Sequence, residues 1–250
     1  MFHIVIPARY ASTRLPGKML AAIRGRPMIQ WVWDRARASG ATRVVIATDD
    51  ERIRAAAAGF GADCVLTSAA HASGTDRVAE VARLLGFAPG DVVLNVQGDE
   101  PLIEPRLIAD LAAALRDRPA VDIATAAAPI RTLVEFLDPN CVKALRGNDG
   151  QALYFSRAPV PWPRDHTVSG QPTRFDGALR HIGIYAYRAR SLLRFAELPP
   201  TPLEQTEKLE QLRALEHGLT MHILTLQEAP EAGVDTPEDL ERVRTKSAAA

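Results

Sequence analysis

Residues 2–18 read FHIVIPARYASTRLPGK, a short apolar run broken by a proline and followed by a polar loop with several basic residues. The nearly continuous apolar run at 2–6 predicts a buried β-strand, because it is too short for a buried helix. A helical pattern follows at 28–39, and a second strand-like run follows at 43–47. Strand, helix and strand in this order predict a right-handed βαβ crossover, the repeating unit of a parallel sheet.

The same alternation continues through the first half of the chain. Further strands are expected at 64–66 and 92–96, and further helices at 51–58, 75–85 and 106–116. Apolar strands of this kind are typical of a sheet that is covered on both faces. The pattern therefore predicts an α/β fold with a Rossmann-like, doubly wound and mostly parallel sheet.

The second half of the chain has a more antiparallel character. The runs at 142–145 and 152–155 flank the turn signal GNDG at 147–150 and predict a β-hairpin. Four prolines predict an irregular segment over 159–177. The other expected elements are strands at 121–128, 182–187 and 221–226 and helices at 204–217 and 237–244, the last with Thr236 as its N-cap. We expect a single domain over residues 1–250, with a doubly wound half at 1–120 and a more antiparallel half at 121–250.

The composition argues against several classes of protein. Lys+Arg and Asp+Glu both total 30, so the formal net charge of the 250 residues is zero. A protein that binds nucleic acid or a membrane surface usually has a basic excess. No apolar stretch approaches the roughly 18 residues of a membrane span, and the N-terminal run is too short for a signal peptide. Cys64 and Cys141 are expected to be reduced thiols, and a cytoplasmic location is expected.

The loop after the first strand is a candidate phosphate site. Arg9, Arg14 and Lys18 occur together with the hydroxyl of Ser12 and the flexible Gly17. Cationic side chains, hydroxyls and backbone N–H groups are suited to a triphosphate. The loop matches neither the Walker A pattern nor the dinucleotide-binding glycine pattern. The alternative is a solvated basic loop, but its position at the carboxyl end of a strand favours a ligand site.

The segment HASGTDR at 71–77 precedes the helix expected at 75–85. Ser73 is suited to cap that helix, with Asp76 complementing its dipole. Capping does not explain Gly74, which would let a ligand approach the backbone. It also leaves unexplained Arg77, a cation at the unfavourable end of a helix. We therefore favour a bound anion near this turn.

Carboxylates follow the strand at 92–96 in the segment NVQGDEP, 95–101. Asp99 would be held rigidly there and is suited to Mg²⁺, although Gly-Asp is also a common turn. Asp235 in VDTPEDL, 234–240, is a second candidate carboxylate or else a helix cap. His181 and Tyr185 are expected on one face of a strand, where they could contact a sugar or be structural.

These segments together resemble the CMP-Kdo synthetases, which are 3-deoxy-manno-octulosonate cytidylyltransferases. The resemblance covers nearly the whole chain and is carried by the following segments: IPARYASTRLPGK (6–18), HASGTDR (71–77), NVQGDEP (95–101), ALYFSRA (152–158), RHIGIY (180–185), LEQLR (209–213) and GVDTPEDL (233–240). The first segment differs from the loop of the sialic acid cytidylyltransferases, which is richer in Gly, Ser and Lys. Met19 replaces a proline that is common in the family, and residues 162–175 match only loosely.

The resemblance implies a role for each candidate residue. The residues expected to act in catalysis are Arg9, Lys18, Asp99 and Asp235. The residues expected to bind the nucleotide are Ala8, Arg9, Ser12, Arg14, Lys18, Ser73 and Gly74. The residues expected to bind the sugar acid are Arg77, Gln97, His181, Tyr185, Glu210 and Gln211. Asp99 and Asp235 are expected to hold Mg²⁺, and Arg77 is expected to pair with the sugar carboxylate.

The implied reaction is transfer of CMP from CTP to 3-deoxy-manno-octulosonate (Kdo), with release of pyrophosphate. The product would supply activated Kdo for lipopolysaccharide synthesis. The family is homodimeric, and the hairpin with residues 153–161 is the implied interface. The resemblance thus implies a nucleotide-binding half at 1–120 and a sugar-binding and dimerisation half at 121–250. The alternatives are a cytidylyltransferase for an 8-amino Kdo analogue or sialic acid, and a non-catalytic nucleotide-binding module. Such a module would have no need for both Asp99 and Asp235.

Overall fold

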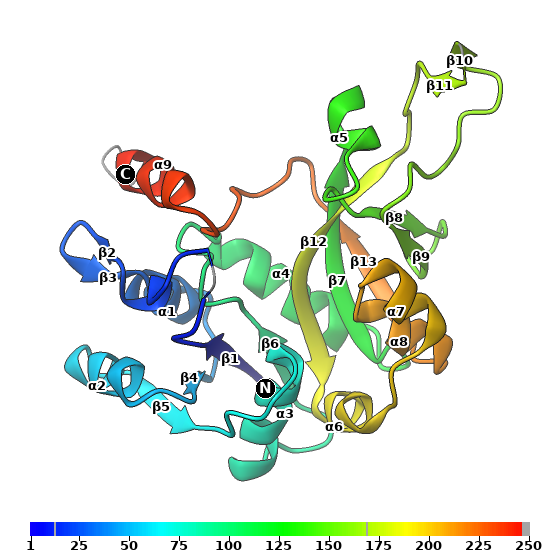
Figure 1. The fold of residues 1–250 in the computed structure, drawn as a ribbon. Helices are drawn as coiled ribbons and strands as arrows, with labels where there is room; N and C mark the ends of the chain where they lie inside the picture. Colours follow the sequence, from blue (N-terminus) through cyan, green and yellow to red (C-terminus); the bar gives the residue numbers. More distant parts are fainter. Residues whose placement is uncertain (13, 169, 247–250) are drawn as a thin grey trace. The chain divides into compact units, whose positions relative to one another are not determined.

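The structure is a computed structural model that describes residues 1–12, 14–168 and 170–246, so Thr13 of the basic loop lies outside the described residues. The chain forms two compact units (Figure 1). Unit 1 comprises Met1–Ala113, Ala186–Ala196 and Pro230–Ala250, and unit 2 comprises Ala114–Tyr185 and Glu197–Ala229. The units do not follow the two halves of the sequence, because the C-terminal segment returns to unit 1.

Unit 1 contains a parallel sheet that confirms the four strands expected in the first half. The central strand β1 (Phe2–Ala8) pairs with β4 (Arg43–Thr48) on one side and β6 (Val92–Asn95) on the other. Strand β5 (Asp63–Leu66) extends the sheet beyond β4. The apolar side chains of β1 and β4 are almost all fully buried, as a sheet covered on both faces requires.

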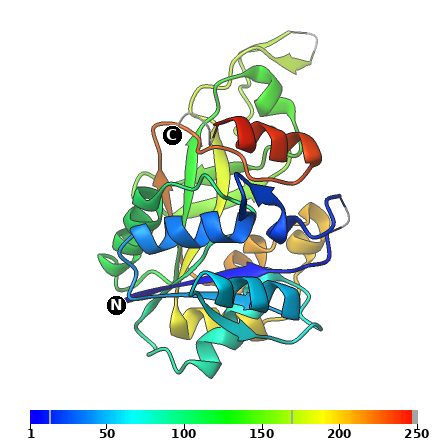
Figure 2. The same ribbon diagram turned by 90° about the vertical axis from the view of Figure 1, so that its left-hand side faces the viewer.

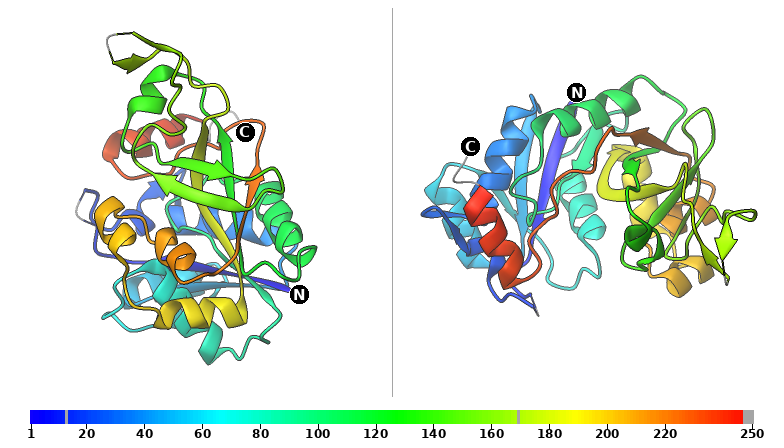
Figure 3. Two further views of the ribbon diagram at one scale, coloured as in Figure 1. Left: turned by 90° about the vertical axis from the view of Figure 1, so that its right-hand side faces the viewer. Right: turned by 90° about the horizontal axis from the view of Figure 1, so that it is seen from above.

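The helices of unit 1 also lie where the apolar periodicity predicts them. They are α1 (Met28–Ala38), α2 (Glu51–Gly59), α3 (Gly74–Leu84) and α4 (Pro105–Arg116), whose last residues enter unit 2. Helices α1 and α3 cover opposite faces of β1 (Figure 3, right). This two-sided cover is the doubly wound arrangement.

Shorter elements complete unit 1. A 3₁₀ turn, η1 (Lys18–Leu20), follows the basic loop, and β2 (Ala22–Ile23) and β3 (Arg26–Pro27) form a small hairpin. The C-terminal helix α9 (Pro237–Lys246) lies beside this hairpin (Figure 2). Its Arg244 donates two hydrogen bonds to the Ala22 carbonyl, which fasten the end of the chain to unit 1.

Unit 2 combines parallel and antiparallel strands. Strand β7 (Ile123–Pro129) pairs in parallel with β13 (Met221–Thr225). The expected hairpin is present as β8 (Lys143–Arg146) and β9 (Ala152–Ser156). Strand β12 (Leu179–Arg188) pairs antiparallel with β8. The mixed α/β class with an antiparallel portion in the second half is therefore confirmed.

Some elements differ from the sequence-based expectation. The segment expected to be irregular contains a small hairpin, β10 (Thr167–Val168) and β11 (Gln171–Pro172). Helices α5 (Leu133–Leu137) and α6 (Ala189–Glu197) were not expected. Both are short, and short apolar segments cannot be assigned by periodicity alone.

The single helix expected at 204–217 is wrong, because two helices occupy that region. They are α7 (Pro202–Glu207) and α8 (Gln211–Glu216), separated by Lys208 in the left-handed conformation with φ 54°. The guanidinium of Arg157 donates to the carbonyls of Glu207 and Lys208 at 2.6 and 3.4 Å. These long-range bonds satisfy carbonyl groups at the end of α7, so the chain can turn there without a glycine.

Candidate active site

Lys18 is the centre of the candidate site in unit 1. Its ammonium group donates to Asp99 Oδ2 at 2.6 Å, to Asp235 Oδ1 at 3.1 Å and to the Val234 carbonyl at 3.2 Å. The side chain is buried. The structure therefore brings together three of the residues that were expected to act in catalysis, from positions up to 217 residues apart.

Two glycines allow the loops that carry the carboxylates to approach each other. A Cβ on Gly98 would lie 3.0 Å from the Pro7 carbonyl oxygen and from Met19 Sδ, so the loop after β6 packs tightly against the end of β1. A Cβ on Gly233 would lie 3.0 Å from the Asp99 carbonyl oxygen. The next residue, Val234, donates its N–H to that same oxygen at 2.8 Å. This close backbone contact places Asp235 beside Asp99.

The charges in this cluster stabilise one another. Burial disfavours the charged form of Lys18, but the hydrogen bonds and charges of Asp99 and Asp235 outweigh it and raise its pKa. Next to Asp99, burial and the charge of Asp99 raise the pKa of Glu100 to about 7. A fixed ammonium between two carboxylates is thus the dominant electrostatic feature of the site.

The remaining cations of the basic loop lie in different environments. Arg14 pairs with Asp235 at 3.0 Å, and both side chains are largely exposed. Arg9 donates to the carbonyl of His71 at 2.7 Å, which links the loop to the HASGTDR segment. Ser12 Oγ accepts a long hydrogen bond of 3.4 Å from the N–H of Leu15. The five N–H groups of an arginine allow Arg9 to bind an anion while it keeps the bond to His71.

The HASGTDR segment begins α3. Ser73 and Asp76 form a capping box, so the helix-capping interpretation of Ser73 is confirmed. A Cβ on Gly74 would meet Pro7 Cγ at 3.5 Å, an ordinary contact, so packing alone does not require glycine there. The last residue of β1, Ala8, is fully buried.

Arg77 has an environment that sequence reasoning missed. Its side chain is fully buried, and it donates to Asp49 Oδ2 at 2.8 Å and to the Thr67 hydroxyl. A protein carboxylate therefore compensates the cation at the start of α3, where a bound anion was expected. Its Nε is buried without a hydrogen-bond partner among the described residues. The Asp49 partner lies directly after β4, a position that could have been considered from the pattern.

Gln97, the other sugar-acid candidate of unit 1, lies in the same loop as Asp99. Its side-chain amide donates to Asn95 Oδ1 at 3.3 Å. The amide lies near Gly74, because a Cβ on that glycine would be 4.0 Å from Gln97 Oε1. The structure thus places Gln97 beside the turn that begins α3.

The other sugar-acid candidates lie in unit 2. The ring of His181 is 5.5 Å from that of Tyr185, which confirms that both project from one face of β12. His181 Nε2 is 2.9 Å from the Thr125 hydroxyl, and burial lowers the pKa of His181 to about 3. The ring is therefore neutral at physiological pH. Glu210 and Gln211 begin α8, and the Gln211 side chain is buried.

The carboxylates of the Lys18 cluster fit a magnesium ion by their chemistry. No group of three or more His, Cys, Asp or Glu side chains that could hold a metal occurs among the described residues. Mg²⁺, however, takes one or two carboxylates and completes its octahedron with water and phosphate oxygens. Asp99 and Asp235 share one cation in this structure, so both oxygens can face one positive centre.

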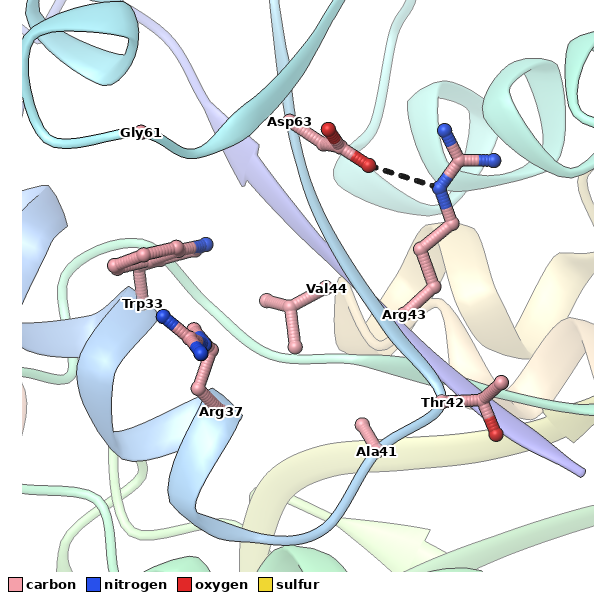
Figure 4. Close-up of a pocket in the computed structure, with 8 residues that line it drawn as sticks. All are labelled: Trp33, Arg37, Ala41, Thr42, Arg43, Val44, Gly61 and Asp63. Carbon is pink, nitrogen blue, oxygen red and sulfur yellow. Dashed lines mark hydrogen bonds and ion pairs between the residues drawn. The ribbon is translucent and has the colours of Figure 1, made fainter.

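A pocket of about 460 Å³ at the other end of unit 1 contains none of the expected site residues (Figure 4). It lies near the beginning of β4, and Arg43 pairs with Asp63 at its edge. In parallel α/β sheets ligands bind at the carboxyl ends of the strands, where the Lys18 cluster lies.

Within the described ranges, no helix is long and apolar enough to cross a membrane.

The comparison with known proteins agrees with this fold. A family profile described as cytidylyltransferase matches residues 3–223. The chain therefore belongs to the cytidylyltransferases. A cytidylyltransferase structure from Leptospira borgpetersenii has 15% identity and a TM-score of 0.62 over 100% of this chain and 87% of that chain, which shows the shared fold.

More similar relatives define the family within this class. The chain is 55% identical to 3-deoxy-manno-octulosonate cytidylyltransferase from Pseudomonas fluorescens, over 97% of this chain and 96% of that protein. The enzyme of the same name from Aliivibrio fischeri is 52% identical over 97% of both chains. A solved CMP:2-keto-3-deoxy-manno-octonic acid synthetase, complexed with CTP, has 42% identity and a TM-score of 0.90 over 99% of this chain and 98% of that chain. The chain is a member of the 3-deoxy-manno-octulosonate cytidylyltransferase family.

Proposed function

We propose that this protein transfers CMP from CTP to 3-deoxy-manno-octulosonate and releases pyrophosphate. The observation that carries the proposal is the contact of Lys18 with both Asp99 and Asp235 at the carboxyl edge of a parallel sheet. The relatives named above, which share more than half of their residues with this chain, support the choice of nucleotide and sugar acid.

The triphosphate would bind to the basic loop. Arg9 contacts the segment that precedes α3, Lys18 lies between the two carboxylates, and Arg14 adds a more exposed charge. Ser12, Ser73, Gly74 and Ala8 are the further nucleotide-binding candidates. Cations fixed around the phosphates would stabilise the charge that develops as the bond to pyrophosphate breaks.

Asp99 and Asp235 would hold Mg²⁺ together with phosphate oxygens and water. When bound, this ion would lower the pKa of the attacking hydroxyl and offset negative charge on the phosphates. The two carboxylates would orient the sugar hydroxyl and the α-phosphorus toward each other. Lys18, which spans both carboxylates in this structure, would turn its donors toward the triphosphate.

The residues proposed to hold the sugar acid are polar, and they are Gln97, Arg77, His181, Tyr185, Glu210 and Gln211. Because the pKa of His181 lies far below neutrality, its ring would act through a hydrogen bond and would carry no charge. The direct contact of Arg77 with the sugar carboxylate stays a prediction, because its guanidinium is buried against Asp49.

We also propose that the protein is a homodimer located in the cytoplasm, where it would serve lipopolysaccharide synthesis. The expected interface at residues 153–161 includes Leu153, which is 61% exposed, and is followed by the exposed Trp162. Large apolar side chains at the surface are typical of interaction sites. Cys64 and Cys141 are free thiols, which suits a reducing compartment.

Pyrophosphate release with each of the four nucleoside triphosphates tests the function, with and without Kdo and Mg²⁺. We expect release only with CTP, Kdo and the metal together. Parallel assays with sialic acid and the 8-amino Kdo analogue test the choice of sugar. A preference for either analogue would correct the substrate, whereas CTP binding without turnover of any sugar acid would indicate a binding module.

Asp99→Asn tests the role of the metal-binding carboxylate. We expect CTP binding to survive in part and kcat to fall on the order of a thousandfold, equivalent to several kcal/mol of barrier. Single-turnover rates and CTP binding by calorimetry separate the two effects. Turnover near that of the unaltered protein would show that Asp99 is not a metal ligand in the reaction.

A further inference from the structure

Residues 68–71, between β5 and α3, are fastened to α3 by the carboxylate of Glu80. Glu80 Oε2 accepts the N–H of Ser68 at 2.9 Å and lies 2.5 Å from His71 Nε2. Burial would raise the pKa of Glu80, but the hydrogen bonds from His71 and Ser68 and the charges of His71 and Arg77 outweigh it and lower the pKa. Glu80 therefore carries a full negative charge at neutral pH.

The same segment holds the candidate phosphate-binding arginine. The carbonyl of His71 accepts the Arg9 guanidinium at 2.7 Å. Arg9 follows β1, whereas Glu80 lies in α3, which covers one face of that strand. A continuous chain of contacts thus runs from Glu80 through His71 to Arg9.

The other end of the segment is fixed independently. Thr67 bonds to the Thr48 carbonyl through both its N–H and its hydroxyl, at 2.8 and 3.1 Å. The stretch from Ser68 to His71 is exposed or half-buried, and two of its residues bond to Glu80. Without that carboxylate, the Ser68 N–H and the His71 ring would both lose their bond to α3.

We propose that Glu80 is a positioning residue for triphosphate binding, which it serves by fixing the His71 carbonyl that orients Arg9. The proposal rests on the proposed function, because it requires Arg9 to contact the triphosphate. Glu80 itself does not touch the nucleotide. Positioning matters because a shift of about 1 Å in a binding group can cost on the order of a hundredfold in rate.

The central test is Glu80→Ala, measured by the KM for CTP, the KM for Kdo and kcat. We expect the KM for CTP to rise about tenfold, while the KM for Kdo changes less than about twofold. Glu80→Gln keeps an acceptor oxygen and should restore most of the affinity for CTP. Glu241→Ala, which removes an exposed carboxylate paired with Arg244 on α9, is the matched control and should leave both KM values unchanged.

Two further variants identify the route of the effect. His71→Ala removes the ring but keeps the carbonyl and the Ser68 contact, so we expect a smaller rise in the KM for CTP. In the double variant Arg9→Ala/Glu80→Ala, the KM for CTP should not exceed that of Arg9→Ala alone. The proposal would be overturned if the rise in the KM for CTP in the double variant equalled the product of the rises in the two single variants. An unchanged KM for CTP in Glu80→Ala would overturn it as well.

The test also separates this proposal from the proposed function. Lack of pyrophosphate release by the unaltered protein would contradict the proposed function. Calorimetric CTP binding would still decide the role of Glu80, since weaker binding by Glu80→Ala supports it and equal binding overturns it. A melting curve for each variant shows whether it is folded. If Glu80→Ala does not fold, the KM for CTP of His71→Ala is the measurement that tests the proposal.

Discussion

At the scale of single residues, Lys18 lies where the proposed function places a metal ion. Its ammonium is 2.6 Å from Asp99 and 3.1 Å from Asp235, so it balances two carboxylates that would otherwise repel each other. A divalent ion has to compete with this internal cation for the same oxygens. The arrangement keeps both carboxylates close together before any ligand arrives.

Lys18→Met should therefore strengthen metal binding in the absence of nucleotide while abolishing most of the turnover. We expect several-fold tighter binding of Mn²⁺, measured by electron paramagnetic resonance, because the competing cation is gone. The folded state should lose about 1–2 kcal/mol of stability, since a partly buried ion pair is broken. Arg14→Met, at the exposed edge of the same cluster, should change both quantities much less. Unchanged Mn²⁺ affinity in Lys18→Met would contradict the competition.

His181 should make folding stability depend on pH. Its folded pKa of about 3 lies below the ordinary value of 6.5, so the unfolded chain binds a proton first as the pH falls. Stability should therefore fall as the pH is lowered from about 6.5 toward 3, by up to about 1.4 kcal/mol per pH unit for this one proton. Urea unfolding at several pH values, compared with His181→Gln, should show a shallower slope in the variant.

His166→Gln is the control for this experiment, because it replaces an exposed histidine. Its stability curve should run parallel to that of the unaltered protein. If the stability curve of His181→Gln also ran parallel to that of the unaltered protein, the His181 ring would be solvated and would titrate normally.

At the scale of elements, the break between α7 and α8 shows how a distant residue ends a helix. Glu207 bonds to Ser156 and to the backbone N–H of Arg157, at 2.7 and 2.9 Å. The Arg157 guanidinium in turn donates hydrogen bonds to the carbonyls of Glu207 and Lys208 at the end of α7. The 3.6-residue periodicity continues across the break, so the sequence pattern alone predicts one helix.

Lys208→Gly should stabilise the protein. A left-handed lysine costs about 1–2 kcal/mol, and the greater chain entropy of glycine costs about 0.5–1 kcal/mol, so a net gain of up to about 1.5 kcal/mol is expected. The Lys208 side chain is exposed, so its loss should matter little. The midpoint of urea unfolding measures the effect. Lys208→Ala keeps the strain and should bring no gain; an equal gain from alanine would point to a different cause.

At the scale of the whole molecule, the chain leaves unit 1, builds unit 2 and then returns. The returning segment carries Asp235, and its Val234 bonds to the backbone of Asp99. The two carboxylates that contact Lys18 in unit 1 therefore come from distant parts of the chain. The expected division at residue 120 assigned Asp235 to the other half.

Leu153→Asp should convert the proposed dimer into a monomer. A charge placed on an exposed leucine in the middle of an apolar interface is strongly unfavourable. Light scattering coupled to gel filtration should give twice 27.2 kDa for the unaltered chain and 27.2 kDa for the variant. Leu84→Asp, on an equally exposed leucine of unit 1, should leave the mass unchanged. A monomeric unaltered protein, or a dimeric Leu153→Asp variant, would contradict the proposed interface.

Much of the fold could be predicted because local sequence patterns determine it. The strands of unit 1 are short apolar runs, and its first four helices have clear apolar stripes. The capping role of Ser73 was also visible from its neighbour Asp76, since a capping box is local. The partners of Arg77 were not visible, because Asp49 and Thr67 belong to other strands and loops.

The sequence by itself determined the βαβ order, the placement of polar loops at strand ends and, by resemblance, the family. Periodicity and turn chemistry act over a few residues, so they can be recognised without coordinates. Only the tertiary structure decided that Lys18 spans Asp99 and Asp235, that Asp49 compensates Arg77, and that Glu80 holds the loop behind Arg9. These are contacts between residues that are distant along the chain. The Lys18 contacts also depend on close backbone approach at Gly98 and Gly233, which no local pattern specifies.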